Sequence, residues 1–538
     1  MNTTLYVNAT FHEHPDATAA LARDGRWLAF GPREELAATQ EAEGARSVDL
    51  GGGYALPGFI DAHTHLLMMG EALSKADLVA AAGLEEIIEG LAAARAAAPE
   101  APRLLGRSWL FSQVPGGAPH RSMLDAAFPE LPVYLDANDV HSAWLNTAAL
   151  KEIGITANTP DPVGGRIGRD ADGEPDGMLY ETALHTYLWP AVAGFSTDEL
   201  RVENLRRALQ AYAATGVTGA VDMAVCEDEW RAMSQLLERD GRLPVRIVGH
   251  WLINRHEDPR VELDQVARAA ELAAAGAAGP AGDWLRLAGI KIVSDGVVDA
   301  CTAAVHSPYT DGSRPEAIWD LPGLRPVVRA ADAAGLQIAI HAIGDAAVTG
   351  SLDALEELPE GHVRARRHRM EHLEVISEAD VARIARLGIV ASMQPVHADP
   401  AIQDNWRAML GAPRIHRGYP WAEFQAAGVT LAFGTDAPTA PYEMLPNLYV
   451  AATRRSALDP SREALEPHLK VTLHDAVAHV TRDAAFASGL EGERGSLAPG
   501  QLADFVVLGR DPFASAHEEL LDGTVLRTVV GAEDTFVA

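Results

Sequence analysis

Cysteine, lysine and long apolar runs are all scarce in this chain of 538 residues. The two cysteines, Cys226 and Cys301, are too few for a disulfide scaffold or a cysteine-built metal cluster, and they favour a reducing compartment. Any metal must therefore be held by His, Asp, Glu or Lys. No apolar stretch approaches the length of about 18 residues that a membrane span needs, and residues 1–10 lack the pattern of a signal peptide. The sequence predicts a cytoplasmic protein with no membrane partner.

Basic residues are also fewer than acidic ones. Lys and Arg total 44 against 75 Asp and Glu, which gives a formal net charge of −31. Such a chain repels phosphate backbones, so nucleic acid is not expected as a partner. Apolar residues make up 48% and charged residues 22%, ordinary globular values that exclude wholesale disorder and a fibrous repeat. Because the length exceeds what one core usually serves, we expect several structural units or a barrel with additions.

Short β-rich runs alternate with Ala- and Leu-rich helical stretches in the middle of the chain, which is the pattern of repeated βα units. Eight strands are expected, at residues 55–65, 217–223, 245–251, 285–294, 336–341, 368–373, 389–394 and 429–435. Eight parallel strands with helices between them predict an α/β fold, a (β/α)8 TIM barrel with its active site at the C-terminal ends of the strands. Polar residues that end these strands are therefore candidates for the site.

The two ends of the chain differ from its middle. Residues 1–56 and 488–538 contain short strands broken by Gly, Pro and Asp turns, which predict a small composite β-sandwich domain beside a barrel at 57–487. About 150 residues separate the first two barrel strands, whereas a single βαβ unit needs roughly 30. We therefore expect an insertion at about 100–200, placed over the barrel mouth as a lid.

Side chains that can hold a metal end several of these strands. They are His63, His65, Lys291, His341, His372 and Asp436. Residues i and i+2 of a strand point to the same side, so His63 and His65 can share an ion. From Lys291 onward the spacings are 50, 31 and 64 residues, or about one, one and two βα units of roughly 30 residues. Six side chains that can ligate a metal ion, all expected at one barrel mouth, predict a metal centre.

Seven motifs occur in order along nearly the whole chain: PGFIDAHTH, GIKIVSDGVVDACTAA, HAIGDAA, RMEHLEV, SMQP, FGTDAP and GSLAPGQLADFVVL. In these motifs the chain resembles the amidohydrolase superfamily, and within it the YtcJ-like and N-substituted formamide deformylase-like metal-dependent hydrolases. The resemblance implies two divalent metal ions, with zinc preferred. It implies that His63, His65 and Asp436 bind one ion and that His341 and His372 bind the other. A carboxylated Lys291 is implied to bridge the two ions.

Lys291 is one of only four lysines, the other basic residues all being arginine. A lysine in an apolar strand resists protonation, and its neutral amine can react with carbon dioxide to give a carbamate, an anionic ligand with two oxygens. Arginine cannot do this. The alternative is an unmodified Lys291 that pairs with Asp295 beside a single metal ion.

Asp436 has two compatible roles. It can ligate metal, and as the catalytic residue it can accept a proton from a metal-activated water and deliver it to the leaving nitrogen. We expect a metal-dependent hydrolase that uses hydroxide to cleave an amide-type C–N bond, in an N-acyl or N-formyl amine or a cyclic amide. The alternatives are a deaminase or an esterase on the same scaffold, or a catalytically silent ligand-binding barrel.

The expected substrate is a small molecule, and five further residues are predicted to contact it: His141, Trp144 and Asn146 in the insertion, and Asp295 and Gln394 at strand ends. For the three residues in the insertion, the alternative is packing within the lid. For Asp295 and Gln394, the alternative is that they orient imidazoles or substrate. Arg369 and Glu371 are expected to orient ligand imidazoles in the same way. A homodimer is the expected assembly, because dimers are the commonest soluble oligomers.

Overall fold

The computed structural model describes residues 2–137, 142–162, 165–181, 183–276 and 280–538. Its elements form two compact units, one made of residues 1–66 and 208–538 and the other of residues 67–207. Within the described ranges, none of the helices has the length and apolar character needed to span a membrane.

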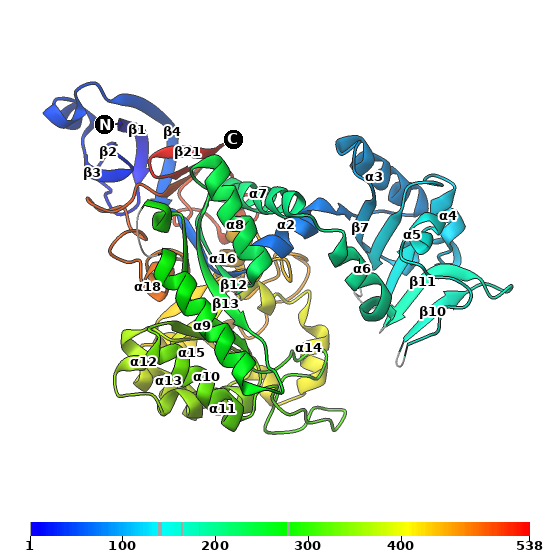
Figure 1. Cartoon of the computed structure of the whole chain (residues 1–538). Helices are drawn as coiled ribbons and strands as arrows, with labels where there is room; N and C mark the ends of the chain where they lie inside the picture. The colour runs from blue at the N-terminus through cyan, green and yellow to red at the C-terminus, as the bar shows by residue number, and fades with distance from the viewer. Residues whose placement is uncertain (1, 138–141, 163–164, 182, 277–279) are drawn as a thin grey trace. The chain divides into compact units, whose positions relative to one another are not determined.

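Eight parallel strands build the barrel of the larger unit, in the order β18-β17-β16-β15-β14-β13-β12-β5 (Figure 1). Their bounds are β5 (Phe59–Thr64), β12 (Val217–Val225), β13 (Arg246–Ile253), β14 (Leu285–Val293), β15 (Gln337–Ala342), β16 (Arg369–His372), β17 (Val390–Met393) and β18 (Leu431–Phe433). Each overlaps one of the eight expected strands. The predicted (β/α)8 TIM barrel is therefore confirmed.

Backbone hydrogen bonds join the first and last strands of the barrel. Just beyond β18, the amide of Asp436 donates to the carbonyl of His63 at 2.7 Å, and the amide of His65 donates to the carbonyl of Ala437 at 3.0 Å. Glycine is needed at position 434, because a Cβ there would lie 2.4 Å from the backbone nitrogen of His63. This seam brings His63, in β5, and His65, just after it, against Asp436.

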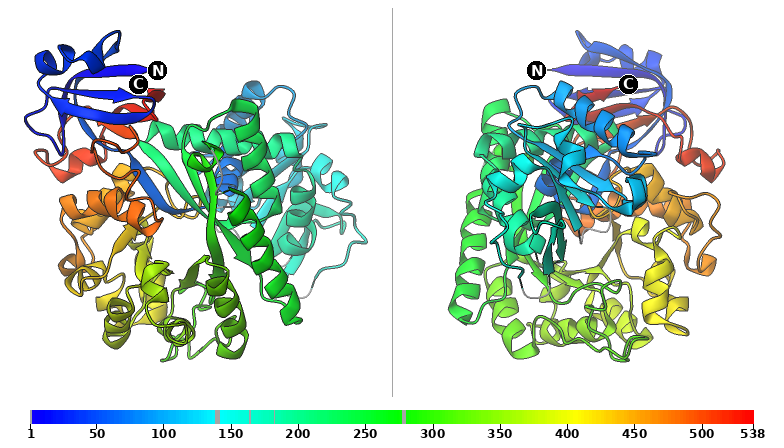
Figure 2. Two further views of the ribbon diagram at one scale, coloured as in Figure 1. Left: turned by 60° about the vertical axis from the view of Figure 1, so that its left-hand side comes forward. Right: turned by 90° about the vertical axis from the view of Figure 1, so that its right-hand side faces the viewer.

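Helices lie outside the strands (Figure 2). They include α8 (Glu227–Asp240), α9 (Pro259–Gly276), α10 (Leu321–Ala333), α11 (Asp345–Glu356), α13 (Glu378–Leu387), α15 (Trp421–Ala426), α17 (Leu473–His479) and α18 (Arg482–Ala487). The local sequence explains their limits. In α13 the Ser377 side chain accepts a hydrogen bond from the amide of Asp380, and Gly388, with a φ of 71°, ends the helix. Its apolar residues Val381 and Ile384 are buried.

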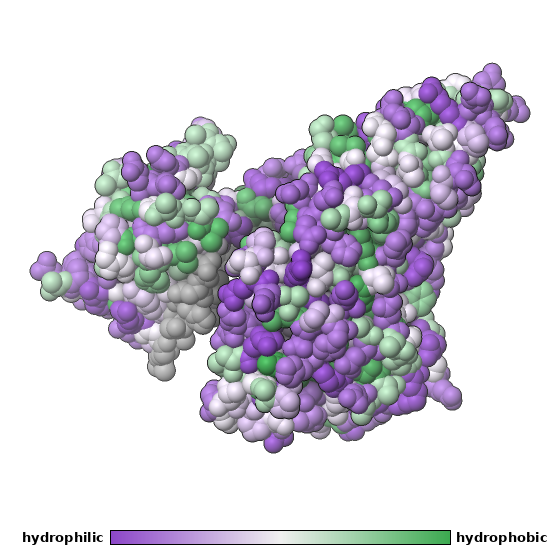
Figure 3. Space-filling model, turned by 180° about the vertical axis from the view of Figure 1, so that it is seen from behind, coloured by the Kyte–Doolittle hydropathy of each residue, from purple (hydrophilic) through white to green (hydrophobic). Residues whose placement is uncertain are grey.

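Figure 3 shows one face of the protein, on which hydrophilic residues predominate and smaller apolar areas lie between them. Large apolar side chains exposed in the larger unit include Val261, Leu263, Ile318, Ile402 and Leu458. Among these, Ile402 lines the cavity that contains the candidate site.

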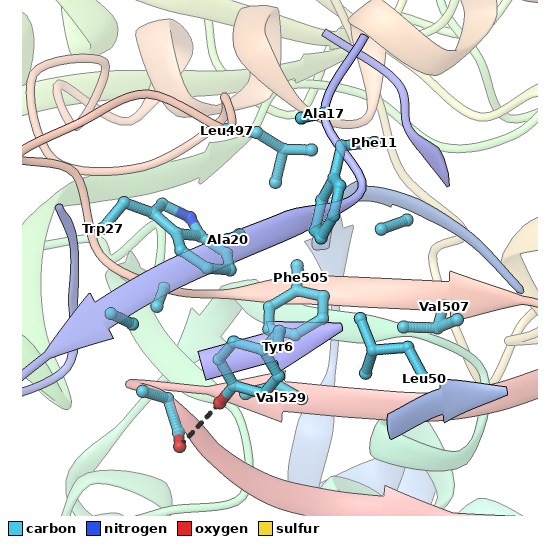
Figure 4. Close-up of a cluster of buried hydrophobic side chains, with 14 residues drawn as sticks. Tyr6, Phe11, Ala17, Ala20, Trp27, Leu50, Leu497, Phe505, Val507 and Val529 are labelled. Atoms are coloured by element: carbon cyan, nitrogen blue, oxygen red, sulfur yellow. Dashed lines mark hydrogen bonds between the residues drawn. The ribbon is translucent and has the colours of Figure 1, made fainter. Parts of the chain in front are cut away.

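Both ends of the chain build one seven-stranded sheet, in the order β21-β20-β19-β4-β1-β2-β3. Its strands are β1 (Thr3–Phe11), β2 (Ala19–Arg23), β3 (Arg26–Gly31), β4 (Arg46–Pro57), β19 (Phe505–Leu508), β20 (Val525–Val530) and β21 (Glu533–Val537). Tyr6, Phe11, Trp27 and Phe505 pack in its core, where the Tyr6 hydroxyl donates to the carbonyl of Ala532 at 2.9 Å (Figure 4). Since β4 leads directly into β5, this sheet holds the start of the first barrel strand.

The second unit, residues 67–207, has a six-stranded sheet in the order β10-β11-β9-β8-β7-β6. Its strands are β6 (Ala76–Asp77), β7 (Leu104–Trp109), β8 (Val133–Ala137), β9 (Ser142–Leu145), β10 (Gly165–Arg169) and β11 (Pro175–Glu181), and its helices include α3 (Leu84–Ala97), α4 (Arg121–Asp125) and α5 (Thr147–Glu152). This unit begins well before residue 100, where the insertion was expected to start. Its predicted place over the barrel mouth stays a prediction.

Candidate metal centre

One cavity of about 430 Å³ in the larger unit collects the predicted metal ligands. All six line it: His63, His65, Lys291, His341, His372 and Asp436. They come from β5, β14, β15, β16 and the segment after β18. The cavity therefore lies at the C-terminal ends of the strands, where barrel active sites form.

The imidazoles of this set pack side by side. The ring centroids of His63 and His65 are 5.6 Å apart, those of His63 and His372 are 4.8 Å apart, and those of His341 and His372 are 4.4 Å apart. Oδ1 of Asp436 lies 3.0 Å from Nε2 of His65 and 3.3 Å from Nε2 of His63, without hydrogen-bond geometry to either. Donor atoms that converge without bonding to one another are arranged like the ligands of a shared cation.

Several of these ligands carry a buried polar atom with no hydrogen-bond partner among the described residues. These atoms are Nδ1 of His65, Nζ of Lys291, Nδ1 of His372 and Oδ1 of Asp436. An unsatisfied buried group costs about 1–3 kcal/mol, so four of them in one cavity need an explanation. Divalent cations would supply the missing partners, and the His and carboxylate donors suit zinc. The residues fit the metal pair, although metal binding by each of them stays a prediction.

The protonation states of the buried bases also suit metal binding. Burial lowers the pKa of His341 to about 3 and holds the pKa of His372 well below its usual range, so both imidazoles are neutral at pH 7. Burial likewise lowers the pKa of Lys291 to about 8. An appreciable fraction of its amine is then neutral at pH 7, which is the form that carbamate formation requires.

A buried ion pair orients His63. Oε2 of Glu371 accepts a hydrogen bond from Nδ1 of His63 at 2.7 Å, and Nε of Arg369 donates to Oε1 of Glu371 at 2.6 Å. Arg369 also donates to the carbonyl of Ala62 at 2.7 Å and to the hydroxyl of Ser392 at 2.6 Å. Because the carboxylate holds the proton on Nδ1, Nε2 of His63 is left as the ligand atom on the side of Asp436.

Asp61 ties the end of β5 to the segment that carries Asp436. Its Oδ1 accepts from the backbone amides of His63 and Thr435 at 3.0 and 3.1 Å. Its Oδ2 accepts from the hydroxyls of Thr435 at 2.6 Å and of Tyr212, in α7 (Asp198–Ala214), at 2.9 Å. Four donors around one fully buried carboxylate give this junction little freedom.

Two ligand residues have left-handed backbone, a conformation that costs a non-glycine residue about 1–3 kcal/mol. The φ angle is 75° at His372 and 59° at Asp436. Neighbouring hydrogen bonds hold both segments, since the amide of Leu373 donates to Ala342 and that of Asp436 donates to His63. Strain held in place by its surroundings is common at functional sites.

The hydrogen bonds of Asp295 go to the backbone. The carboxylate is fully buried, with Oδ1 accepting from the amide of Ile343 at 3.0 Å and Oδ2 accepting from those of Gly344 at 2.9 Å and Ala304 at 3.0 Å. Burial raises its pKa to about 7. Both oxygens are bonded to backbone, and Oδ1 also lies 3.5 Å from Nε2 of His341. Asp295 is not among the described residues that line the cavity, so its substrate contact stays a prediction. The alternative pairing with Lys291 is not formed, because Nζ of Lys291 has no partner among the described residues.

Gln394, the other predicted contact at a strand end, is 2% exposed. Within the described ranges it is not among the residues that line the cavity. A substrate contact from Gln394 is therefore not supported by its position.

Two of the three residues of the insertion that were predicted to contact substrate are described by the structure, and both have structural roles. His141 lies outside the described residues. Trp144, in β9, is fully buried, and its ring packs edge-on at 5.4 Å from that of Trp109. Asn146 is fully buried and caps α5; its side chain bonds to four backbone groups, those of Val133, Ala149, Phe128 and Leu131. Packing, the alternative reading of these positions, accounts for both side chains.

Sequence reasoning missed part of the cavity wall. Six polar residues beyond the six ligands line it: Asp299, Glu374, His397, Gln403, Tyr419 and Thr439. Nε2 of His397 lies 3.6 Å from Oδ2 of Asp436. The donor atoms of His372, Glu374 and His397 also lie within 4.8 Å of one another, as do those of His63, His372 and Asp436.

The motifs contained a signal for two of these residues. Glu374 follows His372 by two residues in RMEHLEV, and His397 follows SMQP by two. The 3₁₀ turn η6 (Pro395–Ala398) after β17 turns the chain back, so that His397 reaches the cavity although it lies beyond the strand end. Such a turn is not visible in the alternation of strand residues.

Comparison with known proteins agrees with this geometry. Residues 46–533 match the Amidohydrolase family. The chain is 29% identical over 541 residues to the putative amidohydrolase YtcJ of Bacillus subtilis (strain 168), covering 97% of each chain. It is 29% identical over 540 residues to the N-substituted formamide deformylase of Arthrobacter pascens, covering 96% of this chain and 94% of the relative.

A solved structure extends the likeness to the fold. An uncharacterized metal-dependent hydrolase from Pyrococcus horikoshii OT3 has a TM-score of 0.77 and 26% identity, over 96% of this chain and 99% of that one. The family match covers most of the sequence, and the barrel carries the expected donor set at the expected strand ends. The chain therefore belongs to the amidohydrolase family and is a metal-dependent hydrolase.

Proposed function

We propose that this enzyme hydrolyses an amide-type C–N bond, in an N-acyl or N-formyl amine or a cyclic amide, with two divalent cations of which zinc is preferred. The observation that carries the proposal is the cluster of unpaired buried donors around Asp436 on one cavity. The likeness to an N-substituted formamide deformylase supports the choice of a C–N bond over a C–O bond.

The residues that would hold the cations follow from the resemblance and the cavity lining. His63, His65 and Asp436 would hold one, His341 and His372 the other, and carboxylated Lys291 both. When bound, such cations lower the pKa of water and polarise a carbonyl group. The Arg369–Glu371 pair and Asp61 keep the imidazoles and Asp436 in place for this chemistry.

Asp436 is the group that moves the proton. Burial by itself would raise its pKa, but His63 and His65 outweigh burial and hold the pKa well below its usual range. The carboxylate is therefore ionised and can accept a proton at pH 7. Oδ1 lies between the two imidazoles, so Oδ2 is the atom that takes the proton from the attacking water and passes it to the leaving nitrogen. An amine leaves only after this protonation.

The rest of the cavity binds the substituents of the amide. Its volume of about 430 Å³ is in the range of small-molecule sites. Apolar residues form much of its wall: Met223, Ala224, Leu252, Val293, Val297, Ile343 and Ile402. They would exclude water from the scissile bond and pack against an alkyl or aromatic group.

Metal content and a substrate panel test this function. The purified chain should bind two divalent ions, chelation should abolish hydrolysis, and added zinc should restore it. The metal-loaded protein should release amine from N-formyl amines, N-acyl amines or lactams in a panel that also contains esters and aminated heterocycles. Turnover confined to esters or to deamination would replace C–N amide cleavage by one of those activities. No turnover of any class would overturn the proposal.

Lys291→Ala and Lys291→Arg should each lower the hydrolysis rate by at least about 10²-fold, because neither side chain can form the bridging carbamate. A short carboxylate such as propionate should partly restore metal content and rate in Lys291→Ala, where it can occupy the vacated space. It should not do so in Lys291→Arg, whose side chain fills that space. Bound metal per chain and initial rates are the measurements.

A direct readout accompanies these rates. Wild-type protein equilibrated with ¹³C-bicarbonate should give a carbamate carbon resonance that is missing from both variants. A Lys291→Arg protein with unchanged metal content and rate would contradict the bridging role of Lys291.

A further inference from the structure

The charged groups of the cavity are unevenly distributed. Apart from the ligand Asp436, the carboxylates that line it are those of Asp299 and Glu374. Among the described lining residues there is no arginine, although arginine supplies nearly all of the basic residues, and the one lysine is Lys291. Apart from Lys291, a substrate carboxylate in this cavity would meet acidic groups and neither lysine nor arginine among the described lining residues.

Glu374 is held rigidly in this wall. It follows β16 directly and is 6% exposed. Its Oε2 accepts a hydrogen bond from Nε1 of Trp406, in α14 (Gln403–Leu410), at 2.8 Å, and its backbone carbonyl accepts from the amide of Tyr419 at 3.0 Å. These contacts fix the carboxylate before any ligand arrives, which lowers the entropy cost of binding.

The carboxylate of Glu374 still has room for donors. Nε1 of Trp406 supplies one hydrogen bond, and a carboxylate offers about four lone-pair sites. Burial raises the pKa of Glu374 to about 7, and a cation held against the carboxylate favours its ionised form. Oε1 lies 4.0 Å from Nδ1 of His397, which is too far for a hydrogen bond. Because Glu374 lines the cavity, its remaining acceptor sites are available to a bound molecule.

We propose that Glu374 binds a cationic group of the substrate, an ammonium or an amidinium, close beside the metal centre. The inference rests on the proposed function and narrows it to amides that carry a basic substituent. Charge-assisted hydrogen bonds to a buried carboxylate are about twice as strong as neutral ones. The apolar wall residues Leu252 and Ile343 would pack against the linker, and the exposed Asp299 adds a second negative charge.

A metal ion is the rival occupant, because Glu374 lies near His372 and His397. The substrate cation is favoured for two reasons. Trp406 already directs a donor at the carboxylate, and such a donor competes with a metal for its lone pairs. In addition, His372 belongs to the ligand set of the metal pair, so a third ion would have to share it.

Three amides of similar length test the proposal on the metal-loaded full-length protein. They are N-formyl-1,3-diaminopropane, N-formylbutylamine and N-formyl-4-aminobutanoic acid, which end in an ammonium, a methyl and a carboxylate group. Binding is measured by calorimetry and hydrolysis by formate release, and the set is repeated with longer chains. Affinity should fall in the order ammonium, methyl, carboxylate, with about tenfold or more between the first and the last.

Single substitutions test which residue causes the preference for the ammonium-bearing amide. Glu374→Gln keeps the shape and removes the charge, so it should lower the ratio of ammonium to methyl affinity about tenfold with no loss of bound metal. Asp299→Asn, at an exposed position where folding is not at risk, should lower the same ratio by a smaller factor. Glu463→Gln makes the same chemical change at an exposed residue outside the cavity lining and should leave the ratio as in the wild type.

Each outcome has one meaning. An unchanged ratio in Glu374→Gln overturns the proposal, and so does a loss of bound metal in that variant, which would make Glu374 a metal ligand. The expected binding order without hydrolysis of any amide would refute the proposed C–N cleavage and leave the cation site standing. Equal affinity for the three amides, together with equal hydrolysis of all three, would refute the cation site and leave the proposed C–N cleavage standing.

Discussion

Asp436→Asn should reduce kcat/KM for amide hydrolysis by about 10⁴-fold, the upper range for loss of a general acid–base group. Asparagine has the same shape, but its amide cannot accept a proton from water or deliver one to the leaving nitrogen. The fold should survive, because asparagine tolerates the φ of 59° found at this position better than other non-glycine residues. Rates on a responsive amide and the thermal unfolding midpoint are the measurements.

Loss of metal must be separated from loss of the proton acceptor, because Asp436 is proposed to serve both roles. The Asp436→Asn protein is therefore assayed with saturating zinc and its metal content is measured in parallel. Full metal occupancy with no return of activity supports the proton role. Recovery of the wild-type rate with zinc would instead restrict Asp436 to metal binding. Asp522→Asn, the same change at an exposed residue, serves as the control.

Glu371→Gln should lower the free energy of unfolding by about 3–5 kcal/mol, because it leaves the guanidinium of Arg369 buried without its counter-charge. Both side chains of this pair are fully buried, and Glu371 is the only carboxylate that contacts Arg369 in the described part of the chain. The same change removes the carboxylate that orients His63, so metal affinity should fall by about 10–100-fold. Denaturant unfolding of the metal-free protein measures stability without the contribution of bound ions.

A paired substitution separates the two effects. Arg369→Met combined with Glu371→Leu replaces the ion pair by apolar groups and should recover most of the lost stability. It should not recover metal affinity, because His63 still lacks its acceptor. A loss of less than about 1 kcal/mol in Glu371→Gln would show that the buried charge of Arg369 finds other compensation.

The barrel and the ligand set were predictable because both depend on local patterns. Each strand is a short β-rich run between helical stretches, and each ligand ends such a run. The barrel topology then places every strand end at one mouth, so residues as distant as His63 and Asp436 could be assigned to one site without knowledge of any distance.

The roles of the other polar residues could not be predicted from their position relative to a strand end. Asp295 ends a strand as the ligands do, yet its carboxylate turns to backbone amides of the segments after β14 and β15. Trp144 and Asn146 have the composition of a binding cluster, but they complete the core and a helix cap of the insertion. Glu374 and His397 reach the cavity only through the path of the chain after β16 and β17.

The amino-acid order by itself thus predicted the fold class, the strand count and six residues that line one cavity, since hydrophobic periodicity and side-chain chemistry are properties of short segments. Only the tertiary structure decided which polar groups face the cavity and which are consumed by the backbone. That choice depends on where buried amides and carbonyls from distant segments need partners, and burial makes every unpaired group costly.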